Sequence, residues 1–200
     1  VVRLPVEDPE EKTQFLAIYE ARSGRVYIYP DTTAAREKFA DEFLSKFYLF
    51  TMNDQSLQGF KVIEGYRGSL KVMPVWEFGL PEGEEVIASS KPQSYEKVAL
   101  LGRSLGNRNV LYKYLNPHMF ALVTKKGSIL KVRIIDSVKG SILYETIHEN
   151  VDVNTNKVHI IQSENWFVYH FWSNDTRAKG YQAAVLELFE GKQENERVER

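Results

Sequence analysis

Along most of the chain, hydrophobic and polar residues alternate in short runs, a two-residue period that predicts β-strands. The first clear runs, Thr13–Glu20 and Arg25–Tyr29, flank the turn signal Ser23-Gly24, and this pattern predicts a β-hairpin. The stretch before them, Val1–Lys12, is acidic and interrupted by proline. We expect it to be an irregular lead-in.

One segment, Asp31–Lys46, has the three-to-four spacing of an amphipathic helix. Its apolar stripe consists of Ala35, Phe39, Phe43 and Leu44. The candidate N-cap is one of Asp31, Thr32 and Thr33. Its other face is charged. The pattern is compatible with a partner-binding helix, but it favours a helical insert that packs on strands through its phenylalanine stripe.

After this helix, short strands and turns recur about every eight to twelve residues, which is typical of an antiparallel meander. The strand groups return at intervals near the roughly forty residues of a propeller blade. We therefore predict a mainly β fold with antiparallel meander sheets, forming part of a β-propeller of about four blades with one inserted helix. The predicted groups are 13–63, 69–100, 110–147 and 157–190, with the helix at 31–46.

The clearest geometry lies in the last third of the chain. Lys157–Ser163 and Trp166–Ser173 are separated by Glu164 and Asn165 alone. A two-residue loop predicts three facing pairs: Ser163 with Trp166, Ile161 with Val168 and His159 with His170. Because both faces of this pair are largely apolar or aromatic, we expect neighbouring blades to cover both of them.

Composition excludes several classes of function. The chain of 200 residues is 43% hydrophobic and 12% aromatic, enough for a packed core. Its net charge of −1 excludes recruitment of nucleic acid or an anionic membrane by bulk charge. The absence of cysteine excludes a disulfide framework, a thiolate zinc site and a cysteine nucleophile. No apolar run approaches the roughly 18 residues that a membrane span needs.

The segment Leu101–Thr124 joins a glycine- and arginine-containing loop to an apolar run. The loop lacks the Gly-Lys-Ser/Thr ending of a phosphate-binding P-loop, and a strand rather than a helix follows it. We interpret it as a connection in which Gly102 and Gly106 shape the turn, while Val110–Tyr114 and Phe120–Thr124 carry one sheet. The candidate partner-contact residues are Gly102, Arg103, Asn107 and Arg108.

No motif predicts catalysis. The pair His159 and His170 supplies two metal ligands at most, whereas zinc sites use three or four. Ser163 lies outside any Gly-x-Ser-x-Gly elbow. We therefore predict no catalytic, cofactor-binding or metal-binding residue and no small-molecule substrate. Asn174-Asp175-Thr176 is an N-glycosylation sequon, so Asn174 is a candidate glycan site if the chain is lumenal or secreted.

Three long stretches carry a family resemblance: VALLGRSLGNRNVLYKYLNPHMFALVT (Val98–Thr124), IIDSVKGSILYET (Ile134–Thr146) and VHIIQSENWFVYHFWSNDTRAKGYQAAVLELFEG (Val158–Gly191). Together they resemble the C-terminal lumenal region of the first, largest subunit of the endoplasmic reticulum (ER) membrane protein complex. The resemblance is strong over Val98–Gly191 and weaker, though traceable, before it.

This resemblance implies a lumenal β-propeller region at the ER membrane, anchored by a membrane helix beyond Arg200. It also implies a non-catalytic scaffold whose partners are the other subunits of a complex that inserts and stabilises transmembrane segments of client proteins. Since the chain begins without a methionine, we interpret it as an excerpt or a processed piece of a longer protein.

Two alternatives stay open at this level. A quinoprotein-like propeller enzyme would need a channel lined by convergent polar groups, and often a bound ion or cofactor. The sequence shows no such cluster. A general propeller protein-interaction module would need only exposed loops on a rigid support.

Overall fold

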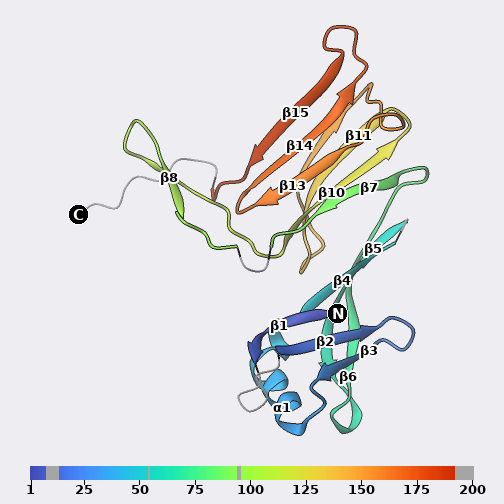
Figure 1. The fold of residues 1–200 in the computed structure, drawn as a ribbon, viewed down its shortest axis with the longest axis vertical. Helices are drawn as coiled ribbons and strands as arrows, with labels where there is room; N and C mark the ends of the chain where they lie inside the picture. The colour runs from blue at the N-terminus through green and yellow to red at the C-terminus, as the bar shows by residue number, and fades with distance from the viewer. Residues whose placement is uncertain (8–13, 54, 94–95, 192–200) are drawn as a thin grey trace. The chain divides into compact units, whose positions relative to one another are not determined.

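The computed structural model describes residues 1–7, 14–53, 55–93 and 96–191. The chain divides into two compact units, Val1–Phe78 and Gly79–Arg200. Nearly all regular structure in the described ranges is antiparallel β-sheet, in agreement with the predicted class (Figure 1).

The first unit is built on a six-stranded sheet of order β1-β2-β3-β6-β5-β4. Its strands are β1 (Val2–Glu7), β2 (Gln14–Glu20), β3 (Arg25–Tyr29), β4 (Tyr48–Met52), β5 (Ser56–Glu64) and β6 (Leu70–Gly79). The hairpin β2–β3 is the one predicted, with Glu20 facing Arg25 and Gly24 in the left-handed conformation (φ 65°).

Two sequence predictions for this unit need correction. The lead-in is partly ordered as β1, which pairs with β2 at the edge of the sheet, where a strand tolerates Pro5; positions 8–13 of the lead-in lie outside the described residues. Leu70–Gly79 does not group with the residues that follow it. It pairs instead with β3 and lies next to β5, because strand pairing across the sheet is set by the shared core and not by sequence order.

Helix α1 (Thr33–Glu42) confirms the predicted insert. Thr32 caps it, since its side-chain oxygen accepts from the amide of Ala35 at 3.2 Å. Ala35 and Phe39 are fully buried. The helix ends earlier than predicted, because Leu44–Lys46 tighten into a 3₁₀ turn (η1) that brings Phe47 edge-on to Phe39, with ring centroids 5.4 Å apart.

The helix and one face of the sheet share a single core. Its buried members are Leu4, Phe15, Ala17, Val26, Ile28, Ala35, Phe39 and Val62. The stripe read from the sequence therefore points into the unit's own core and packs the helix there. The charged face of the helix points outward and is the face that other molecules can contact.

The second unit contains a four-stranded and a three-stranded sheet, of orders β12-β11-β10-β7 and β13-β14-β15. Their strands are β7 (Glu85–Ser90), β10 (Met119–Lys126), β11 (Ile129–Asp136), β12 (Ile142–His148), β13 (His159–Ser163), β14 (Trp166–Ser173) and β15 (Gly180–Glu187). The register of β13 and β14 confirms all three predicted facing pairs.

The two sheets of this unit pack face to face. One face of each contributes to a common core formed by Met119, Ala121, Val123, Leu130, Val132, Ile134, Val151, Ile160, Phe167, Tyr169 and Phe171. Strand β10 is buried at six consecutive positions, Met119–Thr124, so it is covered on both faces. This is the environment of a central strand in a stacked-sheet architecture.

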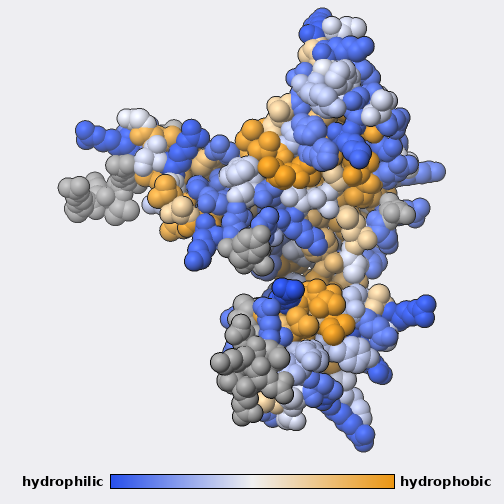
Figure 2. All heavy atoms as spheres, in the orientation of Figure 1, coloured by the Kyte–Doolittle hydropathy of each residue, from blue (hydrophilic) through white to orange (hydrophobic). Residues whose placement is uncertain are grey.

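The three-stranded sheet, by contrast, is covered on one face only within the described residues. Buried and less buried positions alternate strictly along β14, and along β15 exposed and half-buried positions alternate. Ile161, Tyr181 and Val185 are 57%, 60% and 61% exposed. The expectation that both faces are covered is therefore not met by this segment itself, and Figure 2 shows hydrophobic surface over the sheet.

Candidate interaction surfaces

The Gly/Arg loop is a small β-hairpin that projects from the sheets of its unit (Figure 1). It consists of β8 (Gly102–Ser104) and β9 (Val110–Tyr112). Contrary to the prediction, Val110–Tyr112 pair with β8 and not with the sheet that contains Met119–Lys126. The reason is that the close pairing of the two short segments satisfies their backbone groups locally.

The turn of this hairpin owes its shape to a different residue from those predicted. Gly106 has no positive φ, whereas Arg108 adopts the left-handed conformation (φ 72°) and donates its amide to the carbonyl of Leu105 at 3.1 Å. Gly102 matters for another reason: a Cβ there would lie 2.7 Å from Val110 Cγ1, so only glycine lets the two strands approach this closely.

The base of the hairpin is tied to the neighbouring sheet. Tyr114 donates its amide to the carbonyl of Leu188 at 3.0 Å, and Glu190 donates to Tyr112 at 2.7 Å. Lys113 forms an ion pair with Glu164 in the β13–β14 turn. Because that pair is largely shielded from water, it holds the hairpin base more firmly than a surface pair would.

The four predicted contact residues all lie on this hairpin. Gly102 and Arg103 are in β8, and Asn107 and Arg108 are in the turn. Arg103 forms an ion pair with Glu187, with an N–O distance of 3.2 Å. Both side chains of this pair are partly exposed. The predicted contact set is therefore brought together in space.

The residues just before the hairpin form an exposed apolar patch that was not among the predicted contact residues. Leu100 and Leu101 are 67% and 69% exposed, and Val98 is 39% exposed. These three apolar side chains lie within four consecutive positions and outside any strand. Such a cluster, visible in the sequence, indicates an interaction site. We call Val98, Leu100 and Leu101 the apolar base of the hairpin.

The residues considered for catalysis are engaged elsewhere. Ser163 donates its hydroxyl to Glu96, and Glu164 pairs with Lys113, so neither faces a histidine as a triad would require. The rings of His159 and His170 lie side by side with centroids 5.0 Å apart. In the described ranges, no group of three or more acidic or histidine side chains is placed to hold a metal ion.

Asn174 lies in the exposed loop after β14. Its backbone N–H donates to the carbonyl of Asn150 at 2.7 Å, and its side-chain oxygen accepts from the indole of Trp172 at 3.1 Å. The backbone of the sequon is thus held in place while its side chain remains at the surface.

A buried charge network fastens the four-stranded sheet beneath these surfaces. Glu84 accepts from Arg133, from Thr124 at 2.6 Å and from Lys131 at 3.1 Å, and Arg133 also pairs with Glu145. Burial by itself raises the pKa of Glu84, but the hydrogen bonds from Arg133, Thr124 and Lys131 outweigh it and lower that pKa to about 2. The carboxylate is therefore ionised at neutral pH.

The antiparallel sheets and their connecting loops agree with the β-propeller class, to which the comparison with known families assigns this chain. The family model that it matches over residues 1–200 is described as ER membrane protein complex subunit 1, second beta-propeller. The chain belongs to that family.

Curated relatives agree. The ER membrane protein complex subunit 1 of Schizosaccharomyces pombe is 38% identical over 91% of this chain and 20% of its own length. The Gallus gallus protein of the same name is 33% identical over 72% of this chain and 14% of its own length. That of Saccharomyces cerevisiae is 28% identical over 64% and 17%. The chain thus spans about a fifth or less of the length of these relatives.

None of the described helices is both long and apolar enough to cross a membrane.

Proposed function

We propose that this chain is part of a non-catalytic, lumenal scaffold of the ER membrane protein complex. In this role it holds other subunits while the complex supports insertion and stabilisation of transmembrane segments of client proteins. Membership in the subunit 1 family and the names of its relatives support the assignment to the complex. The geometry of the second unit supports the scaffold role.

The observation that carries the proposal is the apolar base of the hairpin. Leu100 and Leu101 expose two-thirds of their surface directly before a hairpin that is fastened by two ion pairs and by backbone hydrogen bonds. Exposed apolar residues on a rigid support suit a protein contact, because burying them against a partner is favourable and ordering the support costs little.

The uncovered face of the three-stranded sheet supports the propeller part of the proposal. Ile161, Val168, Val185 and the aromatic pair Trp172–Tyr181 lie on this face, with the two rings edge to face at 5.0 Å. A blade in a propeller packs each of its faces against a neighbour. We propose that another blade of the complete propeller covers this face.

The test is affinity purification of the full-length protein from solubilised ER membranes, followed by mass spectrometry. The proposal expects the other subunits of the complex in near-stoichiometric amounts. A monodisperse full-length protein that carries no partner would overturn it.

A further inference from the structure

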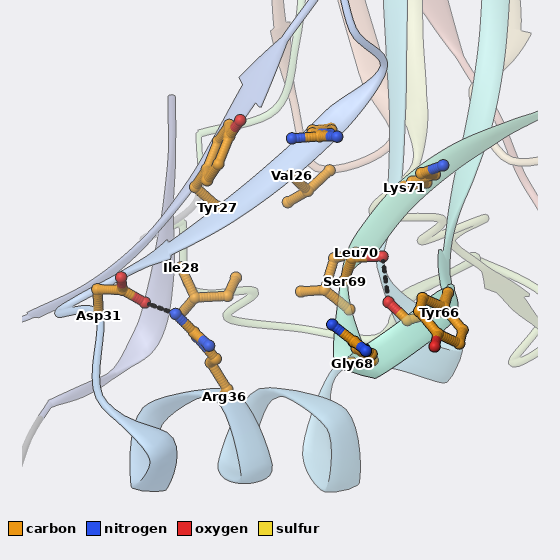
Figure 3. A pocket seen from close by; sticks show the side chains of 12 residues that line it. Val26, Tyr27, Ile28, Asp31, Arg36, Tyr66, Gly68, Ser69, Leu70 and Lys71 are labelled. Carbon is orange, nitrogen blue, oxygen red and sulfur yellow. Dashed lines mark hydrogen bonds and ion pairs between the residues drawn. The ribbon is translucent and has the colours of Figure 1, made fainter.

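A cavity of roughly 440 Å³ lies in the first unit, between strand β3, the start of helix α1 and the β5–β6 turn (Figure 3). Val26, Ile28 and Leu70 line its inner side and face the core of the unit. Arg25 and Lys71, which are cross-strand partners, lie on the opposite, outer face of β3 and β6. Tyr27 and Tyr66 add aromatic surface. The cavity therefore combines a fixed apolar lining with an accessible mouth.

The charge of the lining is strongly one-sided. Four cationic side chains, those of Arg25, Arg36, Arg67 and Lys71, surround the cavity with a single carboxylate, that of Asp31. The whole chain has a net charge of −1, so this concentration of positive charge is local. Such a lining raises the local concentration of anions.

One of these cations is already neutralised. The guanidinium of Arg36 points at Asp31 and forms an ion pair with it (Figure 3). Among the described residues, no carboxylate lies within ion-pair distance of Arg25, Arg67 or Lys71. Two carboxylates stand close by without pairing with them: Glu20 faces Arg25 across β2 and β3, and Oε1 of Glu64 would lie 3.8 Å from a Cβ on Gly68. Three cations are therefore available to a ligand.

The β5–β6 turn fixes the position of one of them. Arg67 (φ 55°) and Gly68 (φ 72°) are consecutive left-handed residues, as in a type I′ hairpin turn. The turn is closed by Ser69, whose hydroxyl donates to the carbonyl of Tyr66 at 2.9 Å. The guanidinium of Arg67 lies over the ring of Tyr66, 5.1 Å from its centroid. This cation–π contact orients the guanidinium without using its N–H donors.

We propose that this cavity binds an acidic peptide segment of a partner protein. An apolar side chain of the segment packs on the exposed rings of Tyr27 and Tyr66 at the mouth of the cavity. Flanking carboxylates pair with Arg25 and Lys71 on the outer face of β3 and β6, and with Arg67 on the turn. A single cavity with three available cations suits a few carboxylates next to an apolar residue. A nucleic acid would need an extended basic surface, whereas the cations here are confined to the lining of one cavity. The inference rests on the proposed scaffold role, since it names the chemistry of one partner contact.

The structure supplies a variant that separates binding from folding. Arg67→Asn creates Asn-Gly, the sequence that a type I′ turn prefers, so the turn keeps or gains stability while the guanidinium is removed. Lys71→Gln removes a second cation from the lining. Arg22→Gln is the matched control, because Arg22 is exposed in the same unit and does not line the cavity.

The experiment uses the full-length protein purified with its complex. The probe is a fluorescein-labelled peptide in which leucine and phenylalanine alternate with glutamate, and a matched peptide carries glutamine in place of glutamate. Binding is followed by fluorescence anisotropy. We expect the acidic peptide to bind, the glutamine peptide to bind at least roughly tenfold more weakly, and Arg67→Asn and Lys71→Gln each to weaken binding by roughly tenfold. Arg22→Gln should bind like the wild type.

Equal binding of the two peptides, or wild-type binding by Arg67→Asn, would overturn the inference. So would displacement of the peptide by inorganic phosphate at the same concentration, because that result would show a simple anion site. Subunit content is measured on the same samples. If the subunits are present and the peptide does not bind, this inference fails alone; if the subunits are absent from the wild type, the proposed function fails.

Discussion

Arg133 and Glu84 form an ion pair that is almost entirely removed from solvent: their side chains are 4% and 0% exposed. Arg133 lies on β11, and Glu84 directly precedes β7. Thr124 on β10 connects them, since its hydroxyl donates to Glu84 at 2.6 Å and accepts from Arg133 at 3.0 Å. One polar network thus links three adjacent strands of the four-stranded sheet.

Removing the charge of Glu84 should loosen this sheet. Breaking one partner of a buried ion pair leaves the other charge uncompensated, so Glu84→Gln should cost about 3 kcal/mol of local stability. Hydrogen exchange of the β10 and β11 amides in the full-length protein should then become roughly a hundredfold faster.

The adjacent residue provides the control. Glu85 pairs with Lys125 at 3.4 Å, but its side chain is 69% exposed. Glu85→Gln should therefore cost less than about 1 kcal/mol of local stability, and the same exchange rates should change correspondingly little. Equal effects of the two substitutions would contradict a structural role for the buried pair.

The same pair predicts a pH dependence. The pKa of Glu84 falls from its ordinary value of 4.5 to about 2 in the folded chain. Its contribution to stability is therefore complete above pH 4.5 and is lost as the pH falls from 4.5 through 2. Between those values the protection of β10 and β11 should decline in the wild type and change less in Glu84→Gln. Parallel pH profiles would show that this carboxylate has no such linkage.

The uncovered face of the β13–β15 sheet predicts protection in the complete protein. Hydroxyl-radical footprinting of full-length protein should modify Tyr181, which is 60% exposed in this chain, almost as slowly as the buried Tyr169. The rates of the same side chains in urea-unfolded protein serve as the reference. A native rate for Tyr181 close to its unfolded rate would show that no blade covers this face.

The glycosylation state of Asn174 tests on which side of the membrane this region lies. If this region is lumenal, endoglycosidase treatment of protein made in a glycosylating host should lower its mass, and Asn174→Gln should remove the effect. The exposed side chain in a fixed loop makes the sequon accessible. Unmodified Asn174 in such protein would count against glycosylation there.

Local patterns in the sequence predicted local structure well. The two-residue loop Glu164-Asn165 determined the register of β13 and β14, and the spacing of Ala35 and Phe39 located the helix. Both features depend on residues close together in the chain, where turn geometry and helical periodicity leave little freedom.

Long-range relationships could not be predicted in this way. Arg133 and Glu84 are 49 positions apart and meet only because β10 lies between their strands. The pairing of β6 with β3 likewise follows from a shared core. The basic cavity could not be predicted because its cations come from two strands, a helix and a turn, and no run of sequence shows them together.

The scaffold role is tested most directly at the apolar base of the hairpin. Leu100→Asp combined with Leu101→Asp in the full-length protein should reduce co-purification of at least one other subunit of the complex, because charges would replace exposed apolar contacts. Met52→Asp, at an exposed apolar position in the first unit, is the control. The account predicts subunit loss with the double variant and wild-type recovery with the control; full recovery of every subunit with the double variant would contradict it.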